Sequence, residues 1–243
     1  MLGKLMYGIL YVWFHTMRAI SWFRWTVEGR HLLPPRESGG AVVVMNHVSW
    51  ADIPIIATLL PFNYRLSWLA KSELFANPII AWWYREMMVI PIRRGRRDLA
   101  ALETAVEALR GGAVLLVFPE GTRSRNGVLS SGRGGAVRMA MLADVPIIPV
   151  GIVGTEHGPK GSFQRKPVHL RIGPAYKVTP PAQGKVTAEQ MEHLTHEMMS
   201  RIADLLPEER RGAYGAGSKN RIPSGEPSAT QPVAAGVSTR HQV

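Results

Sequence analysis

The sequence predicts an α/β fold with a mixed, mostly parallel central sheet flanked by helices. Short apolar runs alternate with segments whose apolar residues recur at helical spacing, the pattern of strands joined by crossover helices. Two runs, residues 41–45 (AVVVM) and 113–118 (AVLLVF), are apolar at every position. Strands of this kind are buried on both faces, as in parallel sheets. At 243 residues, the chain suits one domain of ordinary size with appendages.

The expected elements follow one another at short intervals. Strands are predicted over residues 41–45, 65–70, 88–92, 113–118, 146–150 and 168–172. Helices are predicted over residues 52–60, 78–86, 98–110 and 134–143, with a last helix from Thr187 to Pro207. In that last helix Thr187 is followed three residues later by Gln190. This is the pattern of a capping box, in which two side chains satisfy backbone N–H groups at the start of a helix.

The first 27 residues form an N-terminal segment that is apolar and aromatic. Its charged residues are all basic: Lys4, Arg18 and Arg24. The apolar stretch Leu5–Phe14 is shorter than the roughly 20 residues that span a bilayer, and no cleavage site of a secretory signal follows it. We expect a helix, or a pair of helices, lying in the membrane interface with Trp13, Trp22 and Trp25 at headgroup level. A buried N-terminal helix is the alternative.

Residues 28–210 contain the predicted sheet and are expected to form the α/β domain. Residues 211–243 are rich in Gly, Ser, Ala and Pro and lack an apolar period. Such a tail cannot bury enough apolar surface to order itself, so it is predicted to be disordered.

Composition excludes several kinds of chemistry. The chain contains no cysteine, so disulfides, thiolate metal sites and a cysteine nucleophile are excluded. Its eight histidines lack the spacing of metal ligands, and no metal site is predicted. The formal net charge of +11 favours anionic partners: phosphorylated metabolites, nucleic acid or an anionic membrane surface. Charge alone does not choose among them.

A histidine and an aspartate follow the first strand of the predicted domain. His47 stands at the carboxyl end of that strand, and Asp52 opens the next helix, where Pro54 is tolerated in the first turn. At this spacing the two side chains can meet across the turn. The carboxylate would then hold a proton on one ring nitrogen and leave the other free to accept one. On this stretch alone, a helix cap at Asp52 beside an ordinary loop histidine is an equally good interpretation.

A second polar turn follows the strand over residues 113–118. It comprises residues 119–123 (PEGTR) and lies at a strand's carboxyl end, where open α/β sheets place ligand sites. The turn exposes backbone N–H groups and sets the Thr122 hydroxyl beside the Arg123 guanidinium, which can grip a phosphate bidentately. We therefore expect a phosphate site here; a solvated turn with an incidental arginine is the alternative.

Four arginines follow a third strand end. They are Arg93, Arg94, Arg96 and Arg97, directly after residues 90–92 (IPI). Because the carboxyl ends of parallel strands meet at one edge of a sheet, these arginines are expected near the other two turns. One or two are expected to bind a substrate phosphate, and the others to face anionic headgroups or solvent.

These blocks together resemble the glycerolipid acyltransferase family, typified by the 1-acyl-sn-glycerol-3-phosphate acyltransferases. The matching blocks are residues 46–52 (NHVSWAD), 90–94 (IPIRR), 118–124 (FPEGTRS) and 145–150 (VPIIPV). The resemblance covers roughly residues 40–175, and the first and third blocks are specific when found together. The second block departs from the family at Met88, where glycine is usual, and at Arg93, where an acidic residue is usual. By register, Arg94 is the family's phosphate-contacting arginine.

The resemblance implies an acyltransferase that forms no covalent enzyme intermediate. The donor would be an acyl-CoA or acyl-carrier-protein thioester. The acceptor would be lysophosphatidic acid (1-acyl-sn-glycerol 3-phosphate), whose sn-2 hydroxyl is acylated to give phosphatidic acid in phospholipid biosynthesis. His47 would be the general base, oriented by Asp52. No metal or cofactor is implied beyond the donor as co-substrate.

Further residues are expected to bind or position the substrates. They are Ser49, Lys71, Arg94, Glu120, Gly121, Thr122 and Arg123. Arg94 and Arg123 would hold the acceptor phosphate within a pocket shaped by Glu120 and Gly121. Lys71, at the end of a short strand, would stabilise the oxyanion or grip the donor's phosphates. Ser49, on the turn of the histidine, is expected to position the site and not to act as a nucleophile.

Amphiphilic substrates give the aromatic N-terminal segment a use. The expected partners are the lysophospholipid acceptor, the acyl donor and the membrane surface, without nucleic acid. The expected location is the cytoplasmic face of a bacterial inner membrane. Residues 79–84 (IIAWWY) suit a second membrane contact, the lining of an acyl groove, or a core helix.

Rival functions stay open at this point. The departures at Met88 and Arg93 leave room for another acceptor, such as a different lysolipid or glycerol 3-phosphate. From a different class, a non-catalytic basic module that binds a membrane surface or nucleic acid would use the charge and the tryptophans without the His47–Asp52 pair. A serine hydrolase is disfavoured because the sequence has no GxSxG nucleophile elbow.

Overall fold

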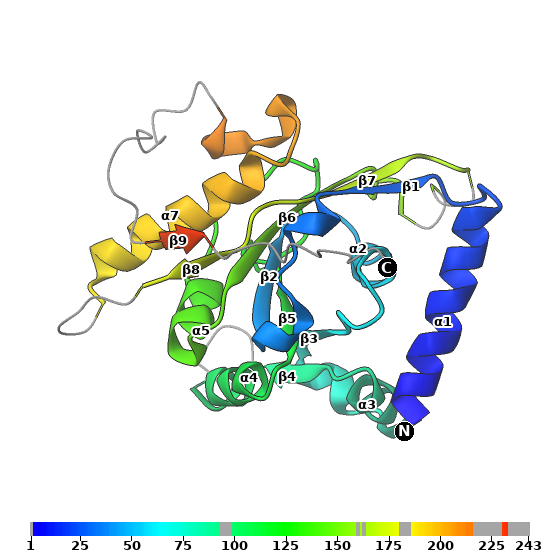
Figure 1. Ribbon diagram of the computed structural model, residues 1–243, viewed down its shortest axis with the longest axis horizontal. Coiled ribbons are helices and arrows are strands. Elements are labelled where there is room, and N and C mark those ends of the chain that lie inside the picture. The colour runs from blue at the N-terminus through cyan, green and yellow to red at the C-terminus, as the bar shows by residue number, and fades with distance from the viewer. Residues whose placement is uncertain are drawn as a thin grey trace, which may run out of the picture.

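The computed structural model describes residues 2–92, 99–158, 161, 164–179, 186–215 and 230–232. Within this part of the chain nine strands form one sheet (Figure 1). The strands are β1 (Trp25–Glu28), β2 (Ala41–Met45), β3 (Leu66–Lys71), β4 (Ile90–Ile92), β5 (Val114–Val117), β6 (Ile147–Val153), β7 (Val168–Ile172), β8 (Tyr176–Val178) and β9 (Thr230–Pro232). The helices are α1 (Leu2–Ala19), α2 (Asp52–Leu59), α3 (Pro78–Glu86), α4 (Leu99–Arg110), α5 (Gly135–Ala143) and α7 (Ala188–Ala203).

The sheet is mixed and mostly parallel, as the sequence predicts. Its strand order is β1-β7-β6-β2-β5-β3-β4, and β8 and β9 continue from β6. β2 lies parallel to both β5 and β6, and β3 lies parallel to both β5 and β4. β7 runs antiparallel to β6, and β1 pairs parallel with β7. Every strand and helix predicted between residues 41 and 207 is present, with small shifts at the ends.

The buried strand β2 separates two apolar cores. Val42 and Val44 pack in one core with α4, α5 and α7, while Val43 and Met45 pack in the other with α2. Helices therefore cover both faces of the sheet, with α1 outside α2 on the second face (Figure 1). This two-sided burial explains why β2 is apolar at every position, since neither face of the strand meets water.

The N-terminal segment differs from the expected helix over residues 1–27. α1 ends at Ala19, and Trp25–Glu28 form β1, which pairs with β7 in the register Trp25↔Val168. Trp25 is only 4% exposed, and its ring stacks on Phe23 with centroids 4.4 Å apart. Trp25 is thus a core residue, and its expected place at headgroup level was wrong because β1 carries it into the sheet.

One side of α1 packs against the domain. The Tyr7 hydroxyl donates to the Ala57 carbonyl of α2 at 2.8 Å, and burial raises the pKa of Tyr7 to about 12. The other side is open, with Leu5, Ile9 and Val12 each more than 60% exposed. None of the described helices combines the length and apolarity needed to cross a bilayer.

The C-terminal tail lies mostly outside the described residues. Two short parts of it are described. Gly212–Tyr214 form a 3-10 turn whose Tyr214 packs against the core of α5 and α7. Thr230–Pro232 form β9, which pairs antiparallel with β8. The prediction of disorder is wrong for these two parts, because contacts with the domain supply order that their own composition does not.

The capping box at the start of α7 is present as predicted. The Thr187 side chain accepts from Gln190 N at 3.1 Å, and the Gln190 side chain accepts from Thr187 N at 3.0 Å. We predict that Thr187→Ala lowers the free energy of unfolding by about 1 kcal/mol, because the N3 amide loses its acceptor. Urea unfolding of the purified protein measures the change.

Thr104→Ala is the matched control for this prediction. It makes the same chemical change in the exposed interior of α4, where Thr104 caps no backbone amide. Alanine has the higher helix propensity, so this variant should match or slightly exceed the parent in stability. Equal losses from both substitutions would contradict the capping role of Thr187.

Candidate active site

His47 and Asp52 meet across the turn between β2 and α2. His47 Nδ1 lies 2.9 Å from Asp52 Oδ2. The same oxygen accepts from the backbone N–H of Val48 at 2.8 Å and of Ser49 at 2.9 Å. Asp52 is fully buried, whereas the His47 side chain keeps 15% of its surface exposed. The carboxylate therefore fixes the turn and the imidazole together. The alternative of a helix cap at Asp52 was wrong, because α2 has Ala51 as its N-cap and the carboxylate bonds to amides that precede the helix.

This geometry selects one tautomer of His47. An ionised carboxylate only accepts hydrogen bonds, so Nδ1 carries the ring proton and donates a hydrogen bond to Asp52. In the neutral ring Nε2 is then a free base. The ring also stacks on Phe118, with centroids 3.8 Å apart and planes 19° from parallel. Asp52 and Phe118 together hold the plane and direction of a basic nitrogen that solvent can reach.

The turn after β5 lies directly beside His47. β2 and β5 pair in parallel with Val44↔Val117, so both chains leave the sheet at the same edge. Glu120 Oε1 accepts from His47 N at 2.8 Å, and Ser124 N donates to His47 O at 2.7 Å. The predicted meeting of the two turns is confirmed, and the backbone of His47 forms the link.

Glu120 is a buried bridge between three segments. Its second oxygen, Oε2, accepts from Ser130 N at 2.9 Å and from Ser130 Oγ at 2.8 Å, and the residue is 4% exposed. Both carboxylate oxygens of Glu120 thus accept hydrogen bonds from the protein itself. Glu120 thus fixes the backbone of His47, and its expected part in shaping a substrate pocket stays a prediction.

Asn46 anchors the other side of the turn. Its Nδ2 donates to Ile152 O at 2.9 Å, and its Oδ1 accepts from Ile152 N at 2.8 Å. The side-chain amide thereby forms the two hydrogen bonds with β6 that a backbone amide of a paired strand would form. It does so directly after the last residue of β2. Sequence reasoning included Asn46 in the matching block but gave it no task, because its partner lies more than 100 residues away.

The turn of Gly121 to Arg123 presents its polar groups outward. Gly121 has φ +69°, and a side chain there would begin 3.3 Å from the Arg133 guanidinium. The left-handed conformation therefore favours glycine at this position, and the Arg133 guanidinium lies close beside it. Thr122 and Arg123 are exposed, so the Arg123 guanidinium is available to an anion. Arg133 was not anticipated, because its neighbourhood depends on the tertiary fold.

Of the remaining predicted site residues, Lys71 and Ser49 are described by the structure and Arg94 is not. Lys71 ends β3 exposed and pairs with Ile92 of β4. Arg94, two residues past Ile92, lies outside the described residues. The Ser49 hydroxyl accepts from Ala51 N at 3.3 Å, and the residue is 7% exposed. That buried hydroxyl suits a positioning residue better than a nucleophile.

Sequence reasoning also missed two contacts that complete the site. Phe118 was part of the matching block, yet nothing in the sequence indicates that it stacks under His47. Ser130, ten residues further along the chain, donates the hydrogen bonds that one of the two Glu120 oxygens accepts. No local sequence pattern marks this position. Both roles come from loops that fold back over the sheet edge.

The fold and the paired turns agree with one protein family. The family model described as Acyltransferase matches residues 24–153, which is more than half of the chain, and the chain belongs to this family. The matched region contains the His47 turn, the Glu120 turn and the five parallel strands that carry them.

Individual relatives agree with this assignment. A chloroplastic 1-acyl-sn-glycerol-3-phosphate acyltransferase of Arabidopsis thaliana is 33% identical over 161 residues, which are 60% of this chain and 44% of that protein. A lyso-ornithine lipid O-acyltransferase of Pseudomonas aeruginosa is 37% identical over 110 residues, 45% of this chain and 41% of that protein. This chain therefore spans less than half the length of these two relatives.

A solved structure shares the fold. The crystal structure of the 1-acyl-sn-glycerophosphate (LPA) acyltransferase PlsC from Thermotoga maritima superposes with a TM-score of 0.62 at 27% identity. The match covers 84% of this chain and 79% of that one. The predicted fold class and family resemblance are both confirmed.

We predict that Glu120→Gln destabilises the protein. The amide replaces one accepting oxygen with a donating NH₂, so at least one buried N–H, of His47 or of Ser130, faces another donor. Leaving a buried donor unpaired should cost about 2 kcal/mol, measured as the free energy of unfolding in urea. Glu103→Gln, on the exposed face of α4, is the matched control and should be neutral. An unchanged unfolding free energy in Glu120→Gln would refute the bridging role.

Proposed function

We propose that this protein transfers an acyl group from a thioester donor to the sn-2 hydroxyl of 1-acyl-sn-glycerol 3-phosphate. The observation that carries the proposal is the His47–Asp52 pair, in which a buried carboxylate fixes the imidazole with one ring nitrogen free. The donor would be acyl-CoA or an acyl-carrier protein, and the product phosphatidic acid. Similarity to enzymes named for this acceptor supports the choice.

The chemistry needs a base but no enzyme nucleophile. His47 Nε2 takes the proton from the acceptor hydroxyl as its oxygen attacks the thioester carbonyl. The C–O bond forms, the tetrahedral intermediate collapses and the C–S bond breaks. The imidazolium then returns its proton to the leaving thiolate. Asp52 stabilises the transient positive charge on His47 without moving from its three hydrogen bonds.

Basic groups at the same edge would hold the charged parts of the substrates. Arg123, exposed beside the Glu120 turn, would bind the acceptor phosphate together with Arg94, with Gly121 and Thr122 lining the site. Lys71, exposed at the end of β3, would stabilise the oxyanion or contact the donor's phosphates. No metal or cofactor takes part in this proposal.

A different acceptor in the same family is the second candidate. The relative named a lyso-ornithine lipid O-acyltransferase supports it, as does the departure from the family pattern at Met88. Met88 has φ 59°, a left-handed conformation that glycine adopts without strain. The backbone conformation at Met88 thus suits the family's usual glycine, while the chain adds a side chain five residues before Arg93 in the sequence.

We place the enzyme at a membrane surface, on the cytoplasmic face of a bacterial inner membrane. The open side of α1, with Leu5, Ile9 and Val12, supports this location because these side chains are exposed on one face. Ile79 and Trp82 of α3 are also exposed, at 74% and 45%, and suit a second contact. A non-catalytic basic surface module would use the same features but would not need the His47–Asp52 pair.

We predict that His47→Ala lowers kcat/KM for acyl transfer by about a thousandfold, because a positioned general base contributes on that scale. Transfer of a radiolabelled acyl group from acyl-CoA to lysophosphatidic acid in vesicles measures it. His193→Ala, at an exposed position of α7, is the matched control and should retain full activity. Unchanged transfer in His47→Ala would remove this residue from the mechanism, and an inactive parent protein would favour the surface module.

We predict that lysophosphatidic acid is the preferred acceptor in a panel that also contains lyso-ornithine lipid, glycerol 3-phosphate and monoacylglycerol. Arg123→Gln should raise KM for lysophosphatidic acid by about tenfold, the loss of one charge-assisted contact. KM for monoacylglycerol, which has no phosphate, should not change. Arg138→Gln, exposed on α5, is the matched control. Preference for an acceptor without phosphate would overturn the proposed substrate.

A further inference from the structure

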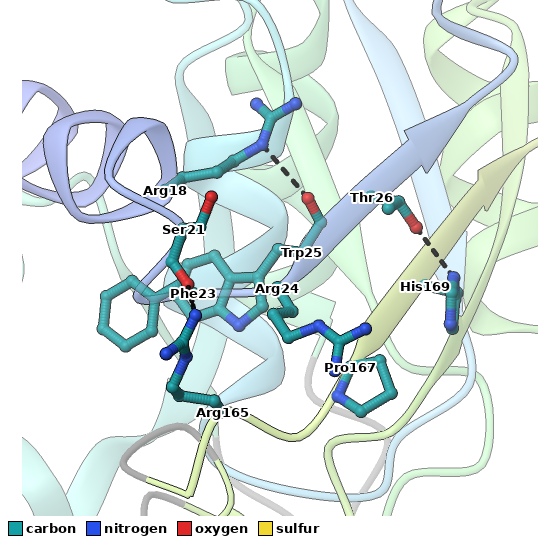
Figure 2. Close-up of a pocket in the computed structure, with 9 residues that line it drawn as sticks. All are labelled: Arg18, Ser21, Phe23, Arg24, Trp25, Thr26, Arg165, Pro167 and His169. Atoms are coloured by element: carbon teal, nitrogen blue, oxygen red, sulfur yellow. Dashed lines mark hydrogen bonds between the residues drawn. The ribbon is translucent and has the colours of Figure 1, made fainter.

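A basic pocket lies where α1, β1 and the loop before β7 meet (Figure 2). Its volume is about 360 Å³, and Arg18, Arg24, Arg165 and His169 contribute to its lining. None of the residues that line it is acidic. The pocket therefore concentrates positive charge, and no role has been given to it in the acyl-transfer site.

Two of the arginines in this pocket, Arg18 and Arg165, are held in place by backbone carbonyls. Arg18 Nε donates to Trp25 O at 3.1 Å, and Arg165 Nη2 donates to Ser21 O at 3.0 Å (Figure 2). Ser21 and Arg165 have φ 57° and 56°, a conformation that is uncommon for residues other than glycine. Each guanidinium has five N–H groups, so most of its donors remain available to a ligand.

Arg24 is the least constrained of these groups. It is exposed, and its side chain makes no hydrogen bond or ion pair with the described residues. It directly precedes β1 and lies beside the start of β7, since Val168 N donates to Arg24 O at 3.0 Å. The Arg24 side chain can therefore be changed without breaking a hydrogen bond or ion pair with the described residues.

An apolar groove adjoins the basic pocket. Phe23 and Trp25 line both, and the groove has a volume of about 420 Å³. Its outer lining includes Trp13, Trp22 and Trp50, which are 49%, 44% and 56% exposed. A positively charged recess and an apolar channel thus lie side by side, bordered by aromatic rings of the type that gather at membrane interfaces.

We propose that the pocket and the groove together bind an anionic phospholipid of the membrane. The phosphodiester would lie among Arg18, Arg24 and Arg165, whose planar guanidinium groups match phosphate oxygens. One acyl chain would lie along the groove against Trp22 and Trp50. A phospholipid fits because it carries its phosphate and its acyl chains on one glycerol, as the two cavities are adjacent here. The inference extends the proposed membrane contact of α1 and rests on it.

This lipid is not the acceptor of acyl transfer. In the strand order β1-β7-β6-β2, the start of β1 lies three strand spacings from the end of β2, about 14 Å. The phosphate of a lysophospholipid is attached to the same glycerol as its free hydroxyl. An acceptor whose phosphate occupies the basic pocket therefore cannot present that hydroxyl to His47.

The bound lipid would orient the catalytic edge toward the bilayer. β7 runs antiparallel to β6, so it begins at the edge where β6 ends, and β6 lies parallel to β2. The start of β1, the start of β7 and the His47 turn hence share one edge of the sheet. A headgroup held there fixes this edge at the interface from which an amphiphilic acceptor would enter.

Vesicle binding of charge-removal variants tests the proposal. We expect Arg24→Gln to weaken binding to phosphatidylcholine vesicles that contain phosphatidylglycerol by about fivefold, and Arg24→Gln with Arg165→Gln by more, each arginine near an anionic surface being worth about this factor. Binding to pure phosphatidylcholine should stay the same. Arg138→Gln removes the same charge from α5 on the other face of the sheet and should bind like the parent.

Several results would overturn the proposal. Equal weakening by Arg138→Gln would mean that total charge, and not the pocket, attracts the vesicles. A raised KM for acyl-CoA in Arg24→Gln with unchanged vesicle binding would assign the pocket to the donor's phosphates. Absence of binding to either vesicle by the parent protein would remove the membrane contact together with the pocket. Because the readout is binding, a failure of the acyl-transfer proposal alone leaves this result unaffected.

Discussion

The buried carboxylate of Asp52 is the group on which the rest of the site depends. A fully buried charge is costly unless it is hydrogen-bonded, and here one oxygen accepts from two backbone amides and from His47. These three bonds fix the turn, the start of α2 and the tautomer of the imidazole. Removing the charge would therefore disturb both the local fold and the orientation of the His47 ring. The atom that fixes the turn is also the one that serves the proposed chemistry.

The parallel sheet brings the other parts to this carboxylate. β2 lies between β5 and β6, so the turn after β5 and the end of β6 flank the His47 turn on its two sides. Glu120 bonds to the His47 backbone from one side, and Asn46 ties the end of β2 to Ile152 on the other. The turn is thus buttressed by two neighbouring strands. In the proposed mechanism, such support keeps His47 within the narrow geometry that proton transfer needs.

Prediction from the sequence was strongest where the signal is local. The apolar run of residues 41–45, the spacing of His47 and Asp52, and the capping box at Thr187 depend on neighbours within about one turn of helix. It was weakest where the partner is distant. Trp25 belongs to a chain segment that looks interfacial, yet pairing with Val168 makes it part of the core.

By itself the sequence determined the α/β class, the order of the central elements, the family and the pairing of His47 with Asp52. Those features follow from periodicity and from residue types at fixed short spacings. Only the tertiary structure decided that Phe118 stacks under His47, that Ser130 completes Glu120, and that Arg165 bonds to Ser21 in the loop before the first β-strand. Each of these contacts joins segments that meet only after the sheet has closed. Their free energy comes from packing and burial between elements, which no local pattern encodes.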